Sequence, residues 1–431
     1  MTIALAWWAA LIGLAIAIGL ILMKLNTTYA LLLGAVAGCL VGGASLSKTV
    51  EIVVTGTQSV MGTVVRVIAA GVFAGVMMES GAADRIARTI VERCGERLAI
   101  FALALATMVI CAVGVFIPVA VLIVAPIAIE VGNRMNISKL ALLVALSGGG
   151  KAGNIISPNP NTIAVATGFK IQASRFMVAS FIPALCGLVI AVALASLLKR
   201  RGTMTSAQDA GGATAQRDSS ALPSIGRSLV APVLAIVLLL ISPIGSMLHV
   251  DVLERFQVDA MYILPLAAII GLVVMRQGAS ILRFCAAGLN RMIDVVMILI
   301  GAGALGVLIT NSDLPRQIVR LINAGGVPGS MLAPIAGILM AAATASTSTG
   351  VILGSNSFGH AILAAGTSPV AAAVTMQAGA TVIDSLPHGN YFHVTAKSMN
   401  MTLAERMTVV GFEALVGLTM TVVATLLYIV W

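Results

Sequence analysis

Long apolar runs, each of about 20 residues, recur along the chain and decide what it can fold into. A helix of that length matches the hydrocarbon core of a bilayer, because each residue adds about 1.5 Å. Hydrophobic residues make up 59% of the 431 residues and charged residues only 10%, well below the roughly 25% of soluble domains. We therefore predict an all-α polytopic membrane protein.

The formal charge of +9 does not indicate a nucleic-acid partner, because the Lys and Arg residues fall between the apolar runs. There they orient helices in the membrane. The five cysteines show neither metal-site spacing nor a C-x-x-C motif, and we interpret them as small packing residues. The expected surrounding is the lipid bilayer, and the composition indicates no metal and no cofactor.

The predicted elements come twice in the same order. The first repeat covers 1–198, a polar and basic linker covers 199–227, and the second repeat covers 228–431. Each repeat has opening spans, an amphipathic connector, an interrupted apolar stretch, a broken span and a last span. In the first repeat these lie at 2–23, 28–47, 51–78, 79–97, 98–131, 139–170 and 176–198. In the second repeat they lie at 228–247, 260–275, 292–310, 311–326, 329–366, 368–396 and 407–430.

The positive charges predict the orientation. If the linker is cytoplasmic, and the stretches 98–131 and 329–366 are re-entrant hairpins, most Lys and Arg residues fall on the cytoplasmic side, Arg406 among them. Each repeat then crosses the membrane an odd number of times, so the second repeat is inverted relative to the first. Inverted repeats are typical of secondary transporters, whose binding site lies at midplane where the repeats meet.

The stretch SGGGKAGNIISPNPNT, residues 147–162, interrupts the first broken span. Pro158 and Pro160 cannot continue a helix, and the freed backbone groups must be covered by protein or line a water-filled cavity. Asn161-Thr162 can cap a new helix near Ile163, whose N-terminus suits a carboxylate. An ordinary loop is the alternative, disfavoured because the flanking apolar runs are too short to cross alone. The substrate-binding candidates are Lys151, Asn154, Ser157, Asn159, Asn161 and Thr162.

A matching interruption, AGATVIDSLPHGN, occupies residues 378–390 of the second broken span. Paired interruptions in the two halves are the best sequence indication of a transporter site. Asp384 and His388 are ionisable near mid-membrane, where charge is costly, so we predict that they carry a coupling proton. Alternatively, Asp384 caps a half-helix and His388 bonds to the backbone. Ser385, His388 and Asn390 are further substrate-binding candidates.

A third polar cluster, AAATASTSTGVILGSNS, covers residues 341–357. On a continuous helix its hydroxyls would point in all directions, whereas at a hairpin tip they can converge on one ligand. Ser and Thr side chains that pack helices together are the alternative. The matching tip at 111–121 is almost wholly apolar and supplies backbone groups only. The substrate-binding candidates here are Ser346, Thr347, Ser348 and Thr349.

Other signals are weaker. Arg66 is interpreted as buried and paired, or as reaching the interface, and Glu79 and Glu413 as solvated or paired near span ends. The GGGK sequence lacks the spacing of a phosphate-binding loop. Asp384, Ser385 and His388 are the residue types of a hydrolase triad, but nothing in the sequence gives them its geometry.

These motifs resemble those of the gluconate permease (GntP) family of proton symporters, within the ion transporter superfamily. The resemblance is carried by SGGGKAGNIISPNPNTIAVA (147–166), by IDSLPHGN (383–390) and by the order of hairpin and broken span in both halves. It implies an elevator-type transporter of the bacterial inner membrane, usually a homodimer, whose hairpins and broken helices move against a scaffold. It implies a small organic acid as substrate, such as gluconate, glycerate, a short hydroxy acid or citrate.

The leading hypothesis is a proton-coupled symporter of a small organic carboxylate, not an enzyme. In it, Lys151 meets the substrate carboxylate or instead stands in for a bound sodium ion. The alternatives are a sodium-coupled carboxylate symporter and a cation/proton antiporter, which would need Asp384 but take up no organic acid. An intramembrane hydrolase using Asp384, Ser385 or His388 would need no ion gradient.

Overall fold

The computed structural model describes residues 5–95, 98–206, 222–248, 250–255, 258–314, 317, 320, 328–387 and 389–430. Regular structure in these residues is helical, with isolated bridges and no strand. Five of the described helices are long and apolar enough to cross a membrane, or six with one bent pair. They are Met61–Glu79, Ile117–Met135, Ile225–Ser242, Gly278–Thr310, Leu403–Val430, and the pair Ala173–Ala179 with Phe181–Leu197. The predicted all-α polytopic membrane class is confirmed.

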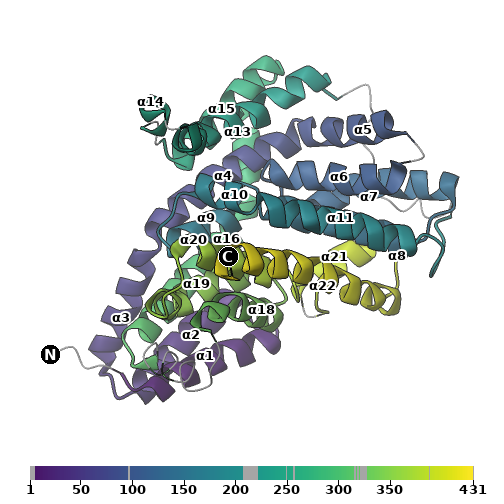
Figure 1. Ribbon diagram of the computed structural model, residues 1–431. Helices are drawn as coiled ribbons and strands as arrows, with labels where there is room; N and C mark the ends of the chain where they lie inside the picture. The colour runs from purple at the N-terminus through teal and green to yellow at the C-terminus, as the bar shows by residue number, and fades with distance from the viewer. Residues whose placement is uncertain are drawn as a thin grey trace.

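One set of helices, the α16 group, is built on α16 (Ile281–Thr310), which packs on α2 (Thr27–Val41), α3 (Leu46–Ser59) and α4 (Met61–Glu79). A Cβ atom on Gly56 would lie 2.5 Å from the Gly303 carbonyl oxygen of α16, so these helices touch through backbone. Such small-residue contacts are how membrane helices approach closely. The other members are α1 (Trp7–Leu22), α13 (Ile225–Leu248), α14 (Asp251–Glu254), α15 (Ala260–Val274) and η3 (Gly278–Ser280). In Figure 1, α1 to α3 lie at the lower left and α13 to α15 at the top.

The second set, the α8 group, is built around α8 (Lys139–Asn154) and α20 (Pro369–Ala380). α8 packs on α6 and α11, and α20 packs on α18 and α22. The other members are α6 (Ala99–Ala112), α7 (Ile117–Met135), α9 (Pro160–Gly168), α10 (Ala173–Ala179), α11 (Phe181–Leu197), η4 (Gly329–Met331), α18 (Leu332–Thr344), α19 (Thr347–Ala364), α21 (Asn390–Ser398), α22 (Leu403–Thr425) and the π-helical turn η5 (Leu426–Val430). The amphipathic α5 (Ala82–Cys94) contacts α6 of this group and α13 of the α16 group.

The glycines of the first broken span have a packing role. α8 runs without interruption through Gly148, Gly149 and Gly150, so this run belongs to the helix rather than to the break. A Cβ atom on Gly153 would lie 2.1 Å from the Met108 carbonyl oxygen of α6. In the other half, a Cβ atom on Gly379 would lie 2.4 Å from the Pro334 carbonyl oxygen of α18. Close backbone packing therefore recurs at corresponding places in the two broken spans.

The first break covers residues 155–159, between α8 and α9. α9 begins at Pro160, and its N-cap is Asn159, whose Oδ1 accepts the Thr162 N–H at 3.0 Å. The predicted cap at Asn161-Thr162 was therefore wrong. The physical reason is that proline, with a fixed φ and no N–H group, suits the first position of a helix. The second break, 381–389, separates α20 from α21, and His388 lies outside the described residues.

The interrupted apolar stretches also consist of paired helices. α6 and α7 are separated at 113–116, and α18 and α19 at 345–346, and each pair packs together. Ala345 adopts a left-handed φ of +46°, which is costly for a residue with a Cβ atom. Re-entrance of these pairs and the inverted relation of the two halves stay predictions.

Several element boundaries differ from the predicted ones. The expected single span 51–78 is two helices that meet at Val60, because α3 ends at Ser59 and α4 begins at Met61. α16 begins at Ile281 rather than at residue 292. The span 176–198 lies in a pair bent by 47°. Much of the linker 199–227 and of the connector 311–326 lies outside the described residues.

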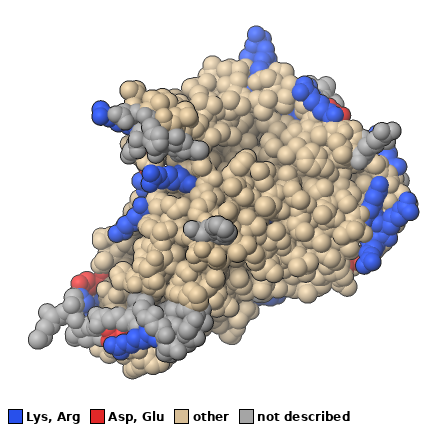
Figure 2. Space-filling view, in the orientation of Figure 1, with Lys and Arg blue, Asp and Glu red and all other residues tan. Residues whose placement is uncertain are grey.

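The surface has the charge distribution of a membrane protein. In Figure 2, Lys and Arg lie along the margins of the molecule, and the broad face between them carries neither. Large apolar side chains are exposed on the helices, among them Val189, Leu197 and Tyr262. Exposed apolar helix faces of this extent are stable in lipid rather than in water.

Candidate functional site

A cavity of about 660 Å³ lies where the α8 group meets the α16 group. Four helices of the α8 group, α7, α9, α19 and α21, begin at its wall. The lining residues at these starts are Phe116, Ile117, Pro118, Asn161, Ser346, Thr347, Ser348, Thr349, Gly389, Asn390 and Tyr391. The α16 group closes the opposite wall with the α1–α2 connection, around Lys24 and Asn26, and with Asp294 of α16.

The four helix starts give the cavity an electrostatic preference. The first backbone N–H groups of a helix have no partner within the helix, and the N-terminus carries roughly half a positive charge. At α19, the Ser346 side chain satisfies one of these N–H groups, because it accepts the Thr349 N–H at 3.3 Å. Helix N-termini that converge on one space favour an anion there.

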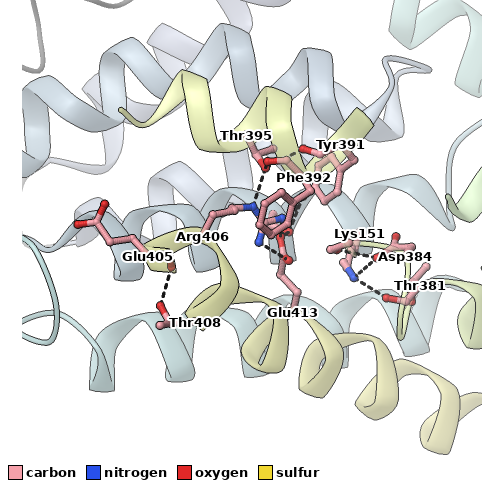
Figure 3. Close-up of polar contacts among 12 residues, drawn as sticks. Lys151, Thr381, Asp384, Tyr391, Phe392, Thr395, Glu405, Arg406, Thr408 and Glu413 are labelled. Atoms are coloured by element: carbon pink, nitrogen blue, oxygen red, sulfur yellow. Dashed lines mark hydrogen bonds and ion pairs between the residues drawn. The ribbon is translucent and has the colours of Figure 1, made fainter. Parts of the chain in front are cut away.

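Lys151 and Asp384 form a buried ion pair that joins the two broken spans (Figure 3). Lys151 Nζ lies 2.6 Å from Asp384 Oδ1 and donates to the Thr381 carbonyl oxygen at 2.5 Å. Thr381 is the C-cap of α20, so the ammonium group also lies at the negative end of that helix. The Lys151 side chain is 0% exposed and does not line the cavity, whereas Asp384 does.

The carboxylate of Asp384 has two further partners. Thr347 Oγ1 donates to Oδ2 at 2.5 Å, and Ser385 Oγ donates to Oδ1 at 2.8 Å. Thr347 belongs to the first turn of α19, so the hydroxyl cluster of 341–357 and the second break meet at this carboxylate. Ser346, Ser348, Thr349 and Asn390 line the cavity around them.

Asn154 is the centre of an amide cluster at the first break. Its Oδ1 accepts from Asn159 Nδ2 at 2.5 Å and from Asn161 Nδ2 at 3.2 Å. Gln377 of α20 reaches the same place, with Nε2 at 3.4 Å from both the Asn154 carbonyl oxygen and Thr162 Oγ1. Asn154 and Asn161 line the cavity. Ser157, Asn159 and Thr162 are buried without lining it.

A second buried ion pair, between Arg406 and Glu413 of α22, is not among the predicted site residues (Figure 3). The guanidinium nitrogens lie 2.9 and 3.0 Å from the two carboxylate oxygens, and Nε donates to Thr395 Oγ1 at 2.8 Å. Ser147 donates to Glu413 Oε1 at 2.5 Å. The charge count assigned Arg406 to the cytoplasmic side without indicating that tertiary packing buries it completely. Its spacing of seven residues from Glu413, which puts both on one face of α22, was the available signal.

Tyr391 connects this pair to the cavity, which it lines. Its hydroxyl donates to Ser147 Oγ at 2.6 Å and lies 3.3 Å from Glu413 Oε1. The Arg406 guanidinium lies over the Tyr391 ring, 5.6 Å from its centroid. Ser147 and Lys151 are one turn apart on α8, so the two ion pairs are neighbours.

Two further lining residues were missed. Asp294 lies in the middle of α16, where an ionisable group within an apolar span was the available signal. His393 lines the cavity, with Nε2 2.8 Å from the Pro387 carbonyl oxygen. No group of three or more His, Cys, Asp or Glu that could hold a metal ion occurs in the described part of the chain.

Arg66 and Glu79, the other charged residues discussed from the sequence, form ion pairs away from the amide cluster. Arg66 lies 2.8 Å from Asp259 Oδ2, and Arg291 lies 2.7 Å from Glu79. Asp259 precedes α15 and caps it by accepting the Met261 N–H at 2.9 Å. Burial opposes the ionisation of Asp259, but its hydrogen bonds from Arg66 and Met261 and the Arg66 charge hold its pKa below the usual range.

The helical membrane fold, with a polar cavity at paired helix interruptions, defines a permease, and comparison with known families identifies which one. Residues 4–430 match the model of the GntP family permeases. The chain belongs to this family, and it is a multi-pass protein of the bacterial inner membrane.

Individual relatives cover most of the chain. An uncharacterized transporter of Haemophilus influenzae is 43% identical over 419 residues, which is 97% of each chain. The high-affinity gluconate transporter of Escherichia coli K12 is 24% identical over 76% of this chain and 77% of its own. The D-serine transporter DsdX of the same strain is 24% identical over 78% of each.

The fold also has a counterpart among solved structures. The crystal structure of the YdaH transporter of Alcanivorax borkumensis, described as having an unusual topology, superposes with a TM-score of 0.64. It covers 90% of each chain at 15% sequence identity. The two chains therefore share a fold.

Proposed function

We propose that the protein is a secondary transporter that moves a small organic carboxylate together with a proton. The observation that carries the proposal is the start of α7, α9, α19 and α21 at one cavity wall. Four positive helix ends with free N–H groups suit a carboxylate. Gluconate and D-serine, named for two Escherichia coli relatives, both bear a carboxylate. A gluconate-, glycerate- or short hydroxy-acid-like substrate fits a carboxylate site of this kind.

The proton binds Asp384 in this proposal. Asp384 is buried, lines the cavity and neutralises Lys151 at 2.6 Å. When Asp384 is protonated, Lys151 keeps a positive charge that nothing on the pair balances. A substrate carboxylate in the cavity restores neutrality, because an uncompensated buried charge is costly. Proton and carboxylate therefore favour each other's binding, which is the thermodynamic basis of symport.

Lys151 acts in this scheme without direct contact to the substrate. Its ammonium group is held by the Asp384 carboxylate and the Thr381 carbonyl oxygen, and it does not line the cavity. It supplies a fixed cation beside the cavity, the electrostatic role that a bound sodium ion would otherwise have. This supports proton coupling over sodium coupling. His388, predicted to share proton coupling, lies outside the described residues.

Movement of the α8 group against the α16 group would give alternating access. The cavity lies between the two groups, and the matched starts of α7 with α19 and of α9 with α21 agree with inverted repeats. In the elevator arrangement that we propose, the α8 group carries the substrate and the α16 group is the scaffold. The homodimer implied by the family resemblance would provide a fixed scaffold in the membrane.

Uptake by the purified protein in liposomes tests the proposal. Radiolabelled gluconate, glycerate and D-serine are offered under an inward proton gradient, under a sodium gradient and under neither. We expect accumulation with the proton gradient alone. Accumulation that requires sodium would support the sodium-coupled alternative, and proton release on sodium or potassium addition without organic-acid uptake would support the antiporter.

The variant Lys151→Ala tests the charge scheme in the same liposomes. We expect loss of proton-driven accumulation, because Asp384 then has no fixed cation to balance. Arg134→Ala, which removes an exposed charge 3.1 Å from Glu130, is the matched control and should behave like the wild type. Unchanged affinity and coupling in Lys151→Ala would contradict both roles considered for this lysine.

A further inference from the structure

Three buried amide groups with unpaired atoms meet beside the cavity, where Asn154 and Asn161 line the wall and Gln377 lies behind them. Asn154 Nδ2, Asn161 Oδ1 and Gln377 Oε1 are buried and have no hydrogen-bond partner. The three side chains are in contact through their other atoms: Asn161 Nδ2 donates to Asn154 Oδ1 at 3.2 Å, and Gln377 Nε2 lies 3.4 Å from the Asn154 carbonyl oxygen. Gln377 is 0% exposed. Native proteins rarely leave buried polar atoms unpaired, so these three atoms indicate a ligand.

The free atoms are one donor and two acceptors, and none carries a charge. A hydroxyl group fits them, because it can accept from Asn154 Nδ2 and donate to Asn161 Oδ1 or Gln377 Oε1. A carboxylate would face two amide oxygens with no proton to offer. An ammonium group would leave Asn154 Nδ2 without an acceptor. The cluster therefore selects a neutral group that both donates and accepts.

We propose that Asn154, Asn161 and Gln377 form a subsite for a hydroxyl group of the substrate, and that Gln377 determines specificity for it. The inference rests on the proposed transport of a small carboxylate and adds the part of the substrate that lies away from the carboxylate. The carboxylate lies at the helix starts around Thr347, and the hydroxyl lies at the first break. Gln377 reaches the subsite from α20 of the second half, so both halves of the chain build it.

Competition between lactate and propionate tests the subsite, since the two acids differ by one hydroxyl. Proton-driven uptake of each labelled acid, and its inhibition by the other, are measured in liposomes. The wild type should prefer lactate by at least about tenfold, because a site built to bond a hydroxyl rejects an analogue that lacks it. Gln377→Leu should bring the preference close to one while propionate uptake persists.

A matched control comes from a second glutamine. Gln277 also has a buried, unpaired Oε1, but its Nε2 donates to the Ser80 carbonyl oxygen at 3.3 Å rather than to the groups around Asn154. Gln277→Leu should keep the wild-type preference. Gln377→Met, nearly equal in volume to glutamine, repeats the test if Gln377→Leu does not fold.

The outcomes separate the two proposals. Equal uptake of lactate and propionate by the wild type would overturn the subsite and leave carboxylate transport standing, with water as the partner of the amides. An equal loss of both acids in the folded Gln377 variants would also overturn it, since that is the effect of lost packing. If neither acid, nor gluconate, glycerate or D-serine, is taken up by the wild type, the proposed function itself fails.

Discussion

Two ion pairs are buried side by side in the α8 group, and their partners differ. Lys151–Asp384 and Arg406–Glu413 each bury both side chains almost completely. The arginine bonds both carboxylate oxygens of Glu413, and Tyr391 and Phe392 cover the guanidinium. The lysine bonds a single oxygen of Asp384, which lines the cavity.

In the proposed function, the difference separates a structural pair, Arg406–Glu413, from an exchangeable pair, Lys151–Asp384. A planar guanidinium matches a carboxylate in a fixed geometry and stays charged at any pH that proteins tolerate. The Asp384 carboxylate takes its remaining bonds from the hydroxyls of Thr347 and Ser385, which can also accept a hydrogen bond. These hydroxyls can therefore donate a hydrogen bond to an ionised carboxylate or accept one from a protonated carboxyl group. We therefore propose that the Arg406–Glu413 pair stabilises the fold, whereas Asp384 is where the proton of the proposed symport binds.

The largest effect on stability is expected from Arg406→Ala. It leaves the Glu413 carboxylate buried without its cation, which costs about 3–5 kcal/mol. Thermal unfolding of the detergent-purified protein measures the loss. Arg134→Ala is the control, because its exposed pair with Glu130 contributes at most about 0.5 kcal/mol. Equal unfolding temperatures of the two variants would contradict the structural role of Arg406.

Replacing both members of each pair by apolar residues distinguishes stability from coupling. We expect Arg406→Met with Glu413→Leu to stay within about 1.5 kcal/mol of the wild type, since such replacements remove both desolvation costs. It should also retain proton-driven uptake. Lys151→Met with Asp384→Leu should fold equally well and lose all proton-driven uptake. The comparison fails if both double variants, or neither, accumulate substrate.

Tyr391→Phe tests the link between the pairs. The change removes a hydroxyl that donates to Ser147 and should cost about 1 kcal/mol. Uptake should fall by less than about tenfold, because the ring still lines the cavity and one lost hydrogen bond is worth a factor of that order. Tyr29→Phe changes an exposed tyrosine and serves as control. Complete loss of coupling in Tyr391→Phe would instead make Tyr391 part of the proton path.

The smallest effect is expected at a third pair, Arg66–Asp259, whose side chains are 35% and 34% exposed. Since the pKa of Asp259 is lowered by folding, its stabilising contribution is complete above the unfolded pKa and is lost as pH falls through the folded pKa. Asp259→Asn should remove this pH dependence of the free energy of unfolding. The dependence amounts to less than about 1 kcal/mol, because solvent screens the pair. Unfolding temperatures at neutral and acid pH measure it, and an unchanged pH dependence would contradict the assignment.

The sequence predicted the interruptions better than their detail. Proline and asparagine within apolar spans indicate breaks, and the flanking helices end at Asn154 and resume at Pro160. The predicted helix cap was wrong because Pro160 occupies the first turn of α9. The glycine run does not break the helix, because its residues stay in α8 and Gly149 packs against α6. Periodicity does not distinguish a packing glycine from a breaking one.

The second ion pair could not be assigned from local pattern alone. Arg406 stands at the edge of an apolar run, where positive charge is expected at the membrane surface. Its burial depends on α8 and α21, which bring Ser147, Tyr391 and Thr395 from other parts of the chain. Gln377 was missed for the same reason, since its partner Asn154 is 223 positions away.

Proton movement driven by substrate gives the most direct test of Asp384 as the proton site. Liposomes with the wild type or Asp384→Asn are given an inward substrate gradient, and external pH is recorded beside substrate counterflow. We predict that the wild type takes up protons with the substrate. Asp384→Asn should exchange substrate across the membrane with no pH change, because its neutral side chain mimics the protonated state. Proton uptake by Asp384→Asn at the wild-type ratio to substrate would contradict the account.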